Sequence, residues 1–270
     1  MKRVPLVFGA AAILVLWLVP RAEAQAGPPF RTDDPETPGN RQSEINLGLI
    51  GDRNRTQGSY ATPNFDINYG LGDRIQLKYE LPFNLQQTPG DSGHVLGGLG
   101  NSLLGLKWRF YEHLEAASQG DKSNFGLSIY PQLTANNPTN SVRRGIVDHG
   151  PKLLLPMEAN ARLGPVRIVV EGGYSFAAKS TPDSWIAGFM AGHEFGATEL
   201  YAEFHDQGDI HGPSRETTLG IGGRHPIDRQ KRLLFMGMVG RSLRTASPSN
   251  EQPQWIAYLG LQWRMATGTK

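Results

Sequence analysis

Apolar and polar residues alternate along most of the chain after residue 43. The clearest example runs from Phe65 to Phe83, where apolar positions recur every second residue in Phe65–Tyr69 and again in Ile75–Phe83. The two stretches are separated by the short segment Leu71–Arg74. A period of two on both sides of a tight turn predicts a β-hairpin with one apolar face and one charged face.

The same alternation recurs to the end of the chain and predicts about twelve strands. These are Glu44–Ile50, a strand ending at Tyr69, Ile75–Phe83, Ser102–Phe110, Phe125–Leu133, Lys152–Leu163, Val166–Phe176, Trp185–Phe195, Leu200–Gln207, Thr217–His225, Arg232–Arg241 and Gln254–Arg264. No segment of comparable length has a helical period, although Tyr111–Ala117 is compatible with one helical turn. Pro131 and Pro156 cannot donate to a strand ladder and predict bulges.

The connections between these strands alternate between short and long. The short ones are Leu71–Arg74, Gly164–Pro165, Gly196–Glu199 and Pro226–Lys231. The long, polar ones are Asn84–Gly97, Thr134–Gly150, Asp206–Glu216 and Ser242–Pro253. Short turns at one end, long loops at the other and an even strand count predict an all-β fold, a closed antiparallel transmembrane barrel.

The positions of the aromatic residues separate a membrane barrel from a soluble one. They gather at strand ends as two rows: Tyr69, Trp108, Phe110, Phe195 and Trp263 beside the short turns, and Phe83, Tyr174, Phe176, Trp185 and Trp255 beside the long loops. Such rows are typical of the aromatic girdles of outer-membrane barrels. A soluble lipocalin-type barrel has about eight strands, and a secreted β-sandwich places its aromatic rings mid-strand. We therefore expect the apolar face to contact lipid.

The polar face is then expected to line the lumen. Its charged members are Asp66, Lys78, Glu80, Lys107, Arg109, Lys152, Glu158, Arg162, Arg167, Glu171, Glu203 and Arg224. Both signs occur in similar amounts, and we expect Glu158 and Arg162 to pair with Arg167 and Glu171 on the adjacent strand. The sequence leaves open whether these charges coat a polar passage or solvate one another in a closed lumen.

The chain opens with the features of a secretory signal. Lys2 and Arg3 precede an apolar run that ends before Pro20, and Ala22–Ala24 offers a cleavage site. We predict a removed signal peptide over residues 1–24, an irregular segment over 25–41, a barrel over 42–264 and a tail over 265–270. The chain has no cysteine, and its net charge of +2 gives no indication of a nucleic-acid partner.

The irregular segment carries a local acidic cluster. Asp33, Asp34 and Glu36 would meet lumen cations such as Lys78, Lys107 or Arg109 if the segment entered the barrel as a plug. The alternative is a disordered lead-in to the first strand.

No convincing catalytic site emerges from the sequence. His205, Asp206, Asp209 and His211 are compatible with a metal loop, but the rim of a polar loop explains them better. His193 is on the lipid-facing register, with no serine beside it in sequence. We therefore expect no metal, no cofactor and no enzymatic activity. We expect Arg143 and Arg144 to be solvated charges of a loop. The alternative is that they bind lipid phosphates at the outer leaflet.

Three motifs resemble one group of outer-membrane proteins, labelled "MetA-pathway of phenol degradation" or simply "transporter". They are the opening Pro29-Phe-Arg-Thr-Asp-Asp-Pro-Glu-Thr37, then Gly70-Leu-Gly-Asp-Arg with Leu77-Lys-Tyr-Glu-Leu-Pro-Phe83, and Gly98-Leu-Gly-Asn-Ser with Gly105-Leu-Lys-Trp-Arg-Phe110. The resemblance covers most of the chain after residue 24. It implies an outer-membrane barrel of a Gram-negative bacterium that passes small, in some cases aromatic, compounds. One departure is that Trp263 is followed by seven further residues, whereas many such barrels end on an aromatic residue.

The function expected from these patterns is an outer-membrane channel or transporter for small molecules, with aromatic or hydrophobic compounds as candidate solutes. The expected partners are outer-membrane lipid, lipopolysaccharide, the barrel-assembly machinery and a small-molecule solute, with no nucleic acid. Two alternatives remain open. One is a structural or ligand-binding barrel that acts through its extracellular loops, and the other is a membrane lipid-modifying enzyme.

Overall fold

The computed structural model describes residues 27–53, 58–87, 94–114, 123–178, 182–212, 215–244 and 255–266. The predicted signal peptide therefore lies outside the described residues. The strands are β1 (Gln42–Arg53), β2 (Gly58–Leu71), β3 (Ile75–Gln87), β4 (Val95–Leu99), β5 (Ser102–Leu114), β6 (Ser123–Ile129), β7 (Gln132–Ala135), β8 (Lys152–Leu163), β9 (Val166–Ala177), β10 (Ser184–Phe195), β11 (Thr198–Asp209), β12 (Arg215–Pro226), β13 (Leu233–Arg244) and β14 (Trp255–Ala266).

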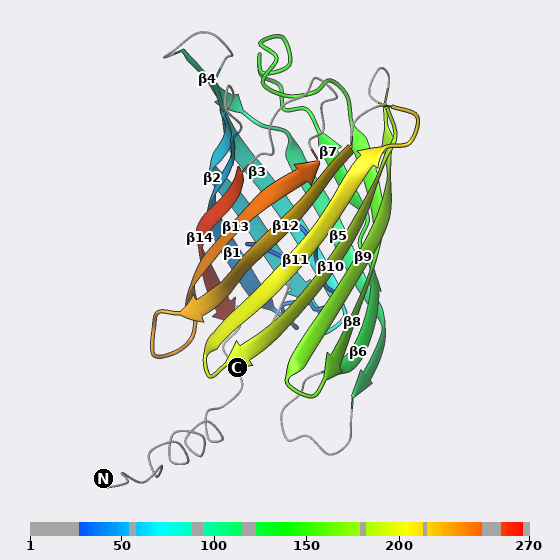
Figure 1. Ribbon diagram of the computed structural model, residues 1–270, viewed down its shortest axis with the longest axis vertical. Coiled ribbons are helices and arrows are strands. Elements are labelled where there is room, and N and C mark those ends of the chain that lie inside the picture. Colours follow the sequence, from blue (N-terminus) through cyan, green and yellow to red (C-terminus); the bar gives the residue numbers. More distant parts are fainter. Residues whose placement is uncertain are drawn as a thin grey trace, which may run out of the picture.

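The strands form one closed antiparallel barrel with twelve wall positions (Figure 1). Closure is made by β1, which pairs with β14 along the whole length of both strands. Two wall positions are each built from two consecutive strands. β4 and β5 both pair with β3, and β6 and β7 both pair with β8. The predicted twelve-stranded barrel is therefore confirmed.

The register places apolar side chains outside and most polar side chains inside. In β2, Phe65 and Ile67 are 47% and 41% exposed on the outer surface, whereas the intervening Asp66 is 1% exposed. The strands from β8 to β14 have 12 residues each. At about 3.3 Å per residue and a tilt of about 40°, such a strand rises about 30 Å, the thickness of a bilayer's hydrocarbon core.

Two local expectations were wrong. Pro131 separates β6 from β7, but the pairing with β8 continues on both sides of Pro156 without a register shift, so neither proline marks a bulge. The extra residue of a bulge lies instead in β2, between Ala61 and Asn64. The region from Tyr111 to Leu114 is strand, because it pairs with β6 rather than forming a helical turn.

The two ends of the barrel differ (Figure 1). The short turns that follow β2, β8, β10 and β12 lie at one end, where β1 also begins and β14 ends. In the turn after β12, the Asp228 carboxylate accepts a hydrogen bond from the backbone N–H of Leu233 at 2.8 Å, and this bond lowers the pKa of Asp228. Within the described residues, no helix is both long and apolar enough to cross a membrane.

Candidate functional site

The segment before β1 lies inside the barrel. Its backbone N–H groups at Arg31 and Thr32 donate to the Glu203 carboxylate at 2.9 and 2.7 Å, and that of Asp33 donates to Glu171 at 3.2 Å. Glu171 and Glu203 belong to β9 and β11, which flank β10. Inward-pointing carboxylates thus satisfy backbone donors that an irregular segment cannot pair within itself.

A buried lysine fixes the segment to a second part of the wall, at β5 and β8. The Lys107 ammonium in β5 is 2.9 Å from an Asp33 carboxylate oxygen and 3.4 Å from Glu158 of β8, and it also donates to the Asp34 carbonyl. Its side chain is fully buried. A buried cation is tolerated only where carboxylates and carbonyls surround it, so these contacts tie the segment and two strands into one unit.

A buried arginine forms the second anchor. The Arg167 guanidinium in β9 is 2.5 Å from Asp34 and 2.8 Å from Glu36. A third ion pair joins Arg31 to Glu216 of β12 at 3.0 Å. The acidic cluster therefore contacts Lys107, one of the three lumen cations named from the sequence. It also contacts Arg167, which the sequence did not single out for this role.

The segment comes close to the barrel wall at glycines. A Cβ atom placed at Gly188 of β10 would lie 2.4 Å from the Thr32 hydroxyl, and one at Gly70 of β2 would lie 1.8 Å from the Gly39 carbonyl oxygen. Side chains at these two positions would occupy the space that the segment fills. Glycine is therefore required here by close approach, not by backbone conformation.

We predict that Gly188→Val displaces the segment from β10 without altering the barrel itself. A bulky side chain cannot share the site of Thr32, so the segment should become accessible to proteases added from the short-turn side. Limited proteolysis of the reconstituted protein, followed by N-terminal sequencing, measures this. Gly172→Val in the neighbouring strand is the control, because a Cβ there meets no atom within 4 Å. Equal protection of the two variants would contradict the prediction.

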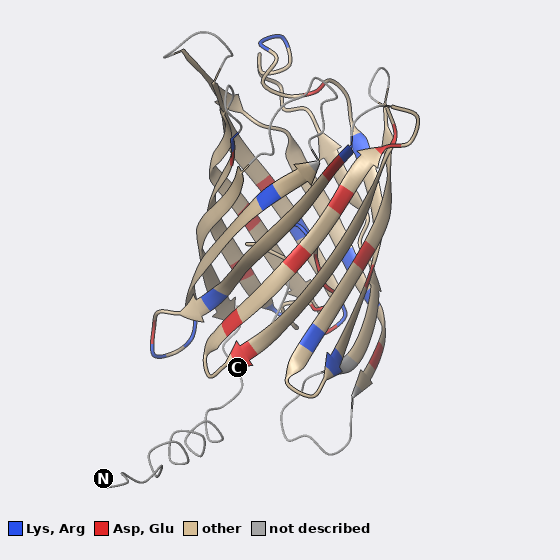
Figure 2. Ribbon diagram, viewed as in Figure 1, with Lys and Arg blue, Asp and Glu red and all other residues tan. Residues whose placement is uncertain are grey.

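The predicted lumen residues occupy the inward register of their strands. Asp66, Lys107, Glu158, Arg167, Glu171, Glu203 and Arg224 are buried, whereas Lys78, Glu80, Arg109 and Arg162 are partly buried. Bands of both charge signs recur along the strands (Figure 2).

The expected pairing among four of these residues was wrong. The register sets Glu158 opposite Glu171 and Arg162 opposite Arg167, so like charges face each other. Each side chain finds its partner elsewhere: Glu158 at Lys107, Arg162 at Glu194 at 2.8 Å, and both Arg167 and Glu171 at the N-terminal segment. The charged side chains of β8 and β9 are therefore bound by other elements and not by each other.

The two other lumen cations named for the segment have different partners. Lys78 is 3.5 Å from Asp66 and 3.0 Å from Glu80 within the hairpin of β2 and β3. Arg109 is 3.1 Å from Glu112 and donates to the Asp73 carbonyl in the first short turn. Neither forms one of the anchors of the segment.

The aromatic residues predicted as girdles lie near the strand ends. Trp108, Phe195 and Trp263 are more than half exposed towards the short-turn end, and Trp255 is 60% exposed at the loop end, where Phe83 is also exposed. Tyr69, Phe110, Tyr174 and Trp185 are partly buried. Phe110 is the extra residue of a bulge in β5, between Arg109 and Tyr111. Their contact with the membrane interface stays a prediction.

Above the segment, on the loop side, lies a lumen cavity of about 550 Å³. Residues 27–31 form part of its lining. One side is mixed: Lys78, Glu80 and Glu171 lie there together with Leu103 and Leu154. The opposite wall, from β1, β13 and β14, is apolar and contains Ile50, Met238, Ile256 and Tyr258.

The apolar wall departs from the expectation of a uniformly polar lumen. The sequence does carry a signal for it. Leu233–Val239 is a run of apolar residues interrupted only by Gly237, not an alternation, so both faces of β13 are apolar. In a membrane barrel such a strand turns one apolar face towards lipid and the other towards the lumen. Met236 and Leu234 are accordingly buried on the inside, while Phe235 and Val239 are exposed on the outside.

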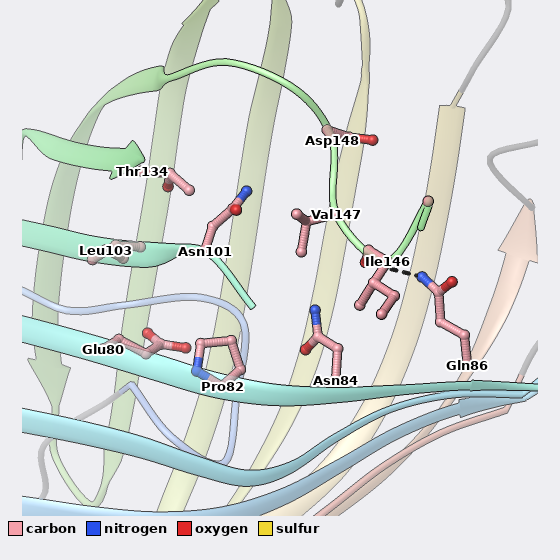
Figure 3. A pocket seen from close by; sticks show the side chains of 11 residues that line it. Glu80, Pro82, Asn84, Gln86, Asn101, Leu103, Thr134, Ile146, Val147 and Asp148 are labelled. Atoms are coloured by element: carbon pink, nitrogen blue, oxygen red, sulfur yellow. Dashed lines mark hydrogen bonds between the residues drawn. The ribbon is translucent and has the colours of Figure 1, made fainter. Parts of the chain in front are cut away.

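A second pocket, of about 370 Å³, lies between β3 and the loop that connects β7 to β8 (Figure 3). Amide side chains from β3 and the β4–β5 junction, namely Asn84, Gln86 and Asn101, lie opposite the loop. Gln86 donates to the Ile146 carbonyl at 3.1 Å and holds the loop in place. Glu80 and Leu103 line both this pocket and the larger cavity, so the two spaces adjoin.

The histidines weighed as candidate chemistry lie apart. His205 is buried on the lumen side of β11, whereas Asp206 on the opposite face binds Arg215 and Thr217. His193 stacks on Phe195 with ring centroids 4.4 Å apart, and the shallow outer pocket around it has no serine in its lining. In the described part of the chain, no three or more His, Asp or Glu side chains are grouped to hold a metal ion.

Comparison with known proteins relates the chain to outer-membrane barrels. No family model matches it, and no curated protein is similar to it in sequence. Among solved structures, an outer-membrane channel from Pseudomonas putida superposes with a TM-score of 0.69 at 16% identity, covering 90% of this chain and 100% of the channel. The KdgM porin in complex with disordered oligogalacturonate gives 0.52 at 8% identity, covering 81% and 98%. The chain thus has the fold of outer-membrane channels.

Proposed function

We propose that this protein is an outer-membrane channel for small molecules, narrowed by its own N-terminal segment. One observation carries the proposal: two adjoining lumen spaces lead from the loop end to the segment. A purely structural barrel gains nothing from such hollows, because filling them with side chains increases stability. The fold shared with known channels supports the same function.

The walls of the larger cavity indicate which solutes it favours. Met238, Ile256 and Tyr258 offer apolar contact on one side, and Lys78, Glu80 and Glu171 offer hydrogen bonds and charge on the other. Ligand sites of this kind combine an apolar surface with a few convergent polar groups. The proposed solutes are small molecules with an apolar body and a polar end. This class includes the aromatic compounds that the resemblance implies.

The proposal extends to location and partners. A lipid-facing apolar surface and a barrel of this height support placement in the outer membrane of a Gram-negative bacterium, after export with a cleaved signal peptide. The partners would be outer-membrane lipid, lipopolysaccharide, the barrel-assembly machinery and the solute. We assign no enzymatic role.

Permeability of reconstituted vesicles tests the proposal directly. Liposomes that contain the protein should swell in solutions of small amphipathic acids, amines and phenols faster than protein-free liposomes. Swelling rates equal to those of protein-free vesicles for the whole panel would contradict a channel. They would favour a barrel that acts through its loops.

We predict that Met238→Trp reduces this permeability several-fold for solutes with an apolar body. The larger ring would fill the cavity beside Ile256 and Tyr258, and the barrel wall would be unchanged. Val239→Trp is the matched control, because this neighbouring residue points outward and is 56% exposed. The initial swelling rate of each variant is the measurement. Equal rates for the two variants would show that solutes do not pass this cavity.

A further inference from the structure

The outer surface of the barrel carries an arginine pair at its loop end. Arg53 closes β1 and Arg241 lies near the end of β13, and both face outward on the same register as exposed apolar residues. Between them lies Trp255, the first residue of β14, which is directly opposite Arg53 in one ladder and Arg241 in the other. The three side chains therefore form one row across three adjacent strands.

We call these three side chains the Arg53–Trp255–Arg241 row. The Arg241 guanidinium stacks over the Trp255 ring, 5.4 Å from its centroid, which leaves the edge of the guanidinium free to donate hydrogen bonds. Trp255 is 60% exposed. Opposed side chains on neighbouring antiparallel strands are about 5 Å apart at Cβ, so each arginine is within reach of a ligand seated over the ring.

The row carries two positive charges. Within the described residues, no carboxylate forms an ion pair with Arg53 or Arg241. A second outward pair at the same rim differs in this respect. Arg215 stacks over Trp185 at 5.4 Å, but it is neutralised by the Asp206 carboxylate on its own surface. Two adjacent cations on an apolar surface are costly unless an anion joins them.

We propose that the Arg53–Trp255–Arg241 row binds the phosphate group of a phosphorylated glycolipid in the outer leaflet. Arginine forms paired hydrogen bonds with phosphate oxygens, and tryptophan favours the boundary between acyl chains and head groups. Exposed Val239 on β13 and Leu259 on β14, which face outward on the membrane side of the row, would contact the acyl chains. The site rests on the outer-membrane location proposed above, because the long-loop end of such a barrel faces outward.

Binding of purified lipid A to the protein in phosphatidylcholine nanodiscs tests the site. Native mass spectrometry gives the affinity for lipid A with both phosphates and for the same lipid after removal of its phosphates. Arg53→Gln/Arg241→Gln should bind the phosphorylated lipid about tenfold more weakly than the unaltered protein. Both proteins should bind the dephosphorylated lipid equally and weakly.

Arg74→Gln/Arg229→Gln is the control, because it removes two exposed cations from the short-turn end. Heat-modifiable migration in gels verifies that every variant is folded. An equal loss of affinity in the control and the test variant would overturn the proposal, as would no loss in either. Binding of inorganic phosphate without binding of lipid A would overturn the lipid assignment. Vesicle swelling in phosphatidylcholine, which contains no lipid A, tests the channel separately.

Discussion

Deletion of residues 27–39 should increase single-channel conductance several-fold. These residues occupy the lumen between β5 on one side and β9 to β11 on the other, so their removal leaves a wider aqueous path. The barrel should still fold, because its ladders close without the segment. Lys107, Arg167, Glu171 and Glu203 would then be hydrated instead of buried. Planar bilayers containing the purified deletion variant give the measurement.

A replacement control distinguishes the loss of the plug from general damage. In this control, residues 27–39 are kept, but Asp228 in the distant turn is changed to Asn, which alters a turn and leaves the lumen intact. Its conductance should equal that of the unaltered protein. If the deletion variant has the same conductance as the Asp228→Asn variant and the unaltered protein, the segment does not limit ion flow. The narrowest point of the lumen would then lie elsewhere.

Removing one anchor should have an effect of a different kind. Arg167→Met leaves Asp34 and Glu36 inside the barrel without the cation that now binds both. Loss of one partner of a buried ion pair costs about 3–5 kcal/mol, because the remaining charge stays desolvated. The segment should therefore leave its site part of the time. We expect a lower unfolding temperature and a conductance that fluctuates between the level of the unaltered protein and that of the deletion variant.

A combination that removes all three charges provides the sharpest check of this reasoning. Arg167→Met/Asp34→Asn/Glu36→Gln removes the cation together with the carboxylates that need it, so most of the stability should return. Arg162→Met is the control for loss of a lumen arginine, because Arg162 pairs with Glu194 and not with the segment. Thermal unfolding by gel migration and single-channel traces give the two readouts. A triple variant less stable than Arg167→Met would contradict the electrostatic explanation.

The strands and their faces could be predicted from the sequence because each is a local property. A period of two decides which side chains share a face, and the turn residues decide where a strand ends. Phe65, Ile67 and Tyr79 are exposed on the outside as this rule requires, with Asp66 buried between them. The rule failed for the apolar lumen wall, most clearly at β13, where both faces are apolar and no alternation distinguishes inside from outside.

The partners of the charged residues depended on the tertiary structure. Residues opposite each other are set by strand register, and a shift of one residue changes every pair. Here the two-residue turn Gly164–Pro165 sets the register and opposes Glu158 to Glu171 and Arg162 to Arg167, but it does not indicate which other elements bind these side chains. Arg167 then binds carboxylates more than 130 positions earlier in the chain. Such a contact arises only when the barrel closes around the segment.

The sequence by itself determined that this chain forms a barrel with an apolar exterior, since alternation, turn spacing and aromatic positions are all encoded locally. Only the tertiary structure decided what fills the lumen. Closing the strands brings Lys107, Arg167, Glu171 and Glu203 to one level of the barrel, where all four bind residues 31–36. The physical reason is that a buried charged side chain needs a hydrogen-bonded partner. Which residue becomes that partner depends on what the closed barrel brings close to it in space.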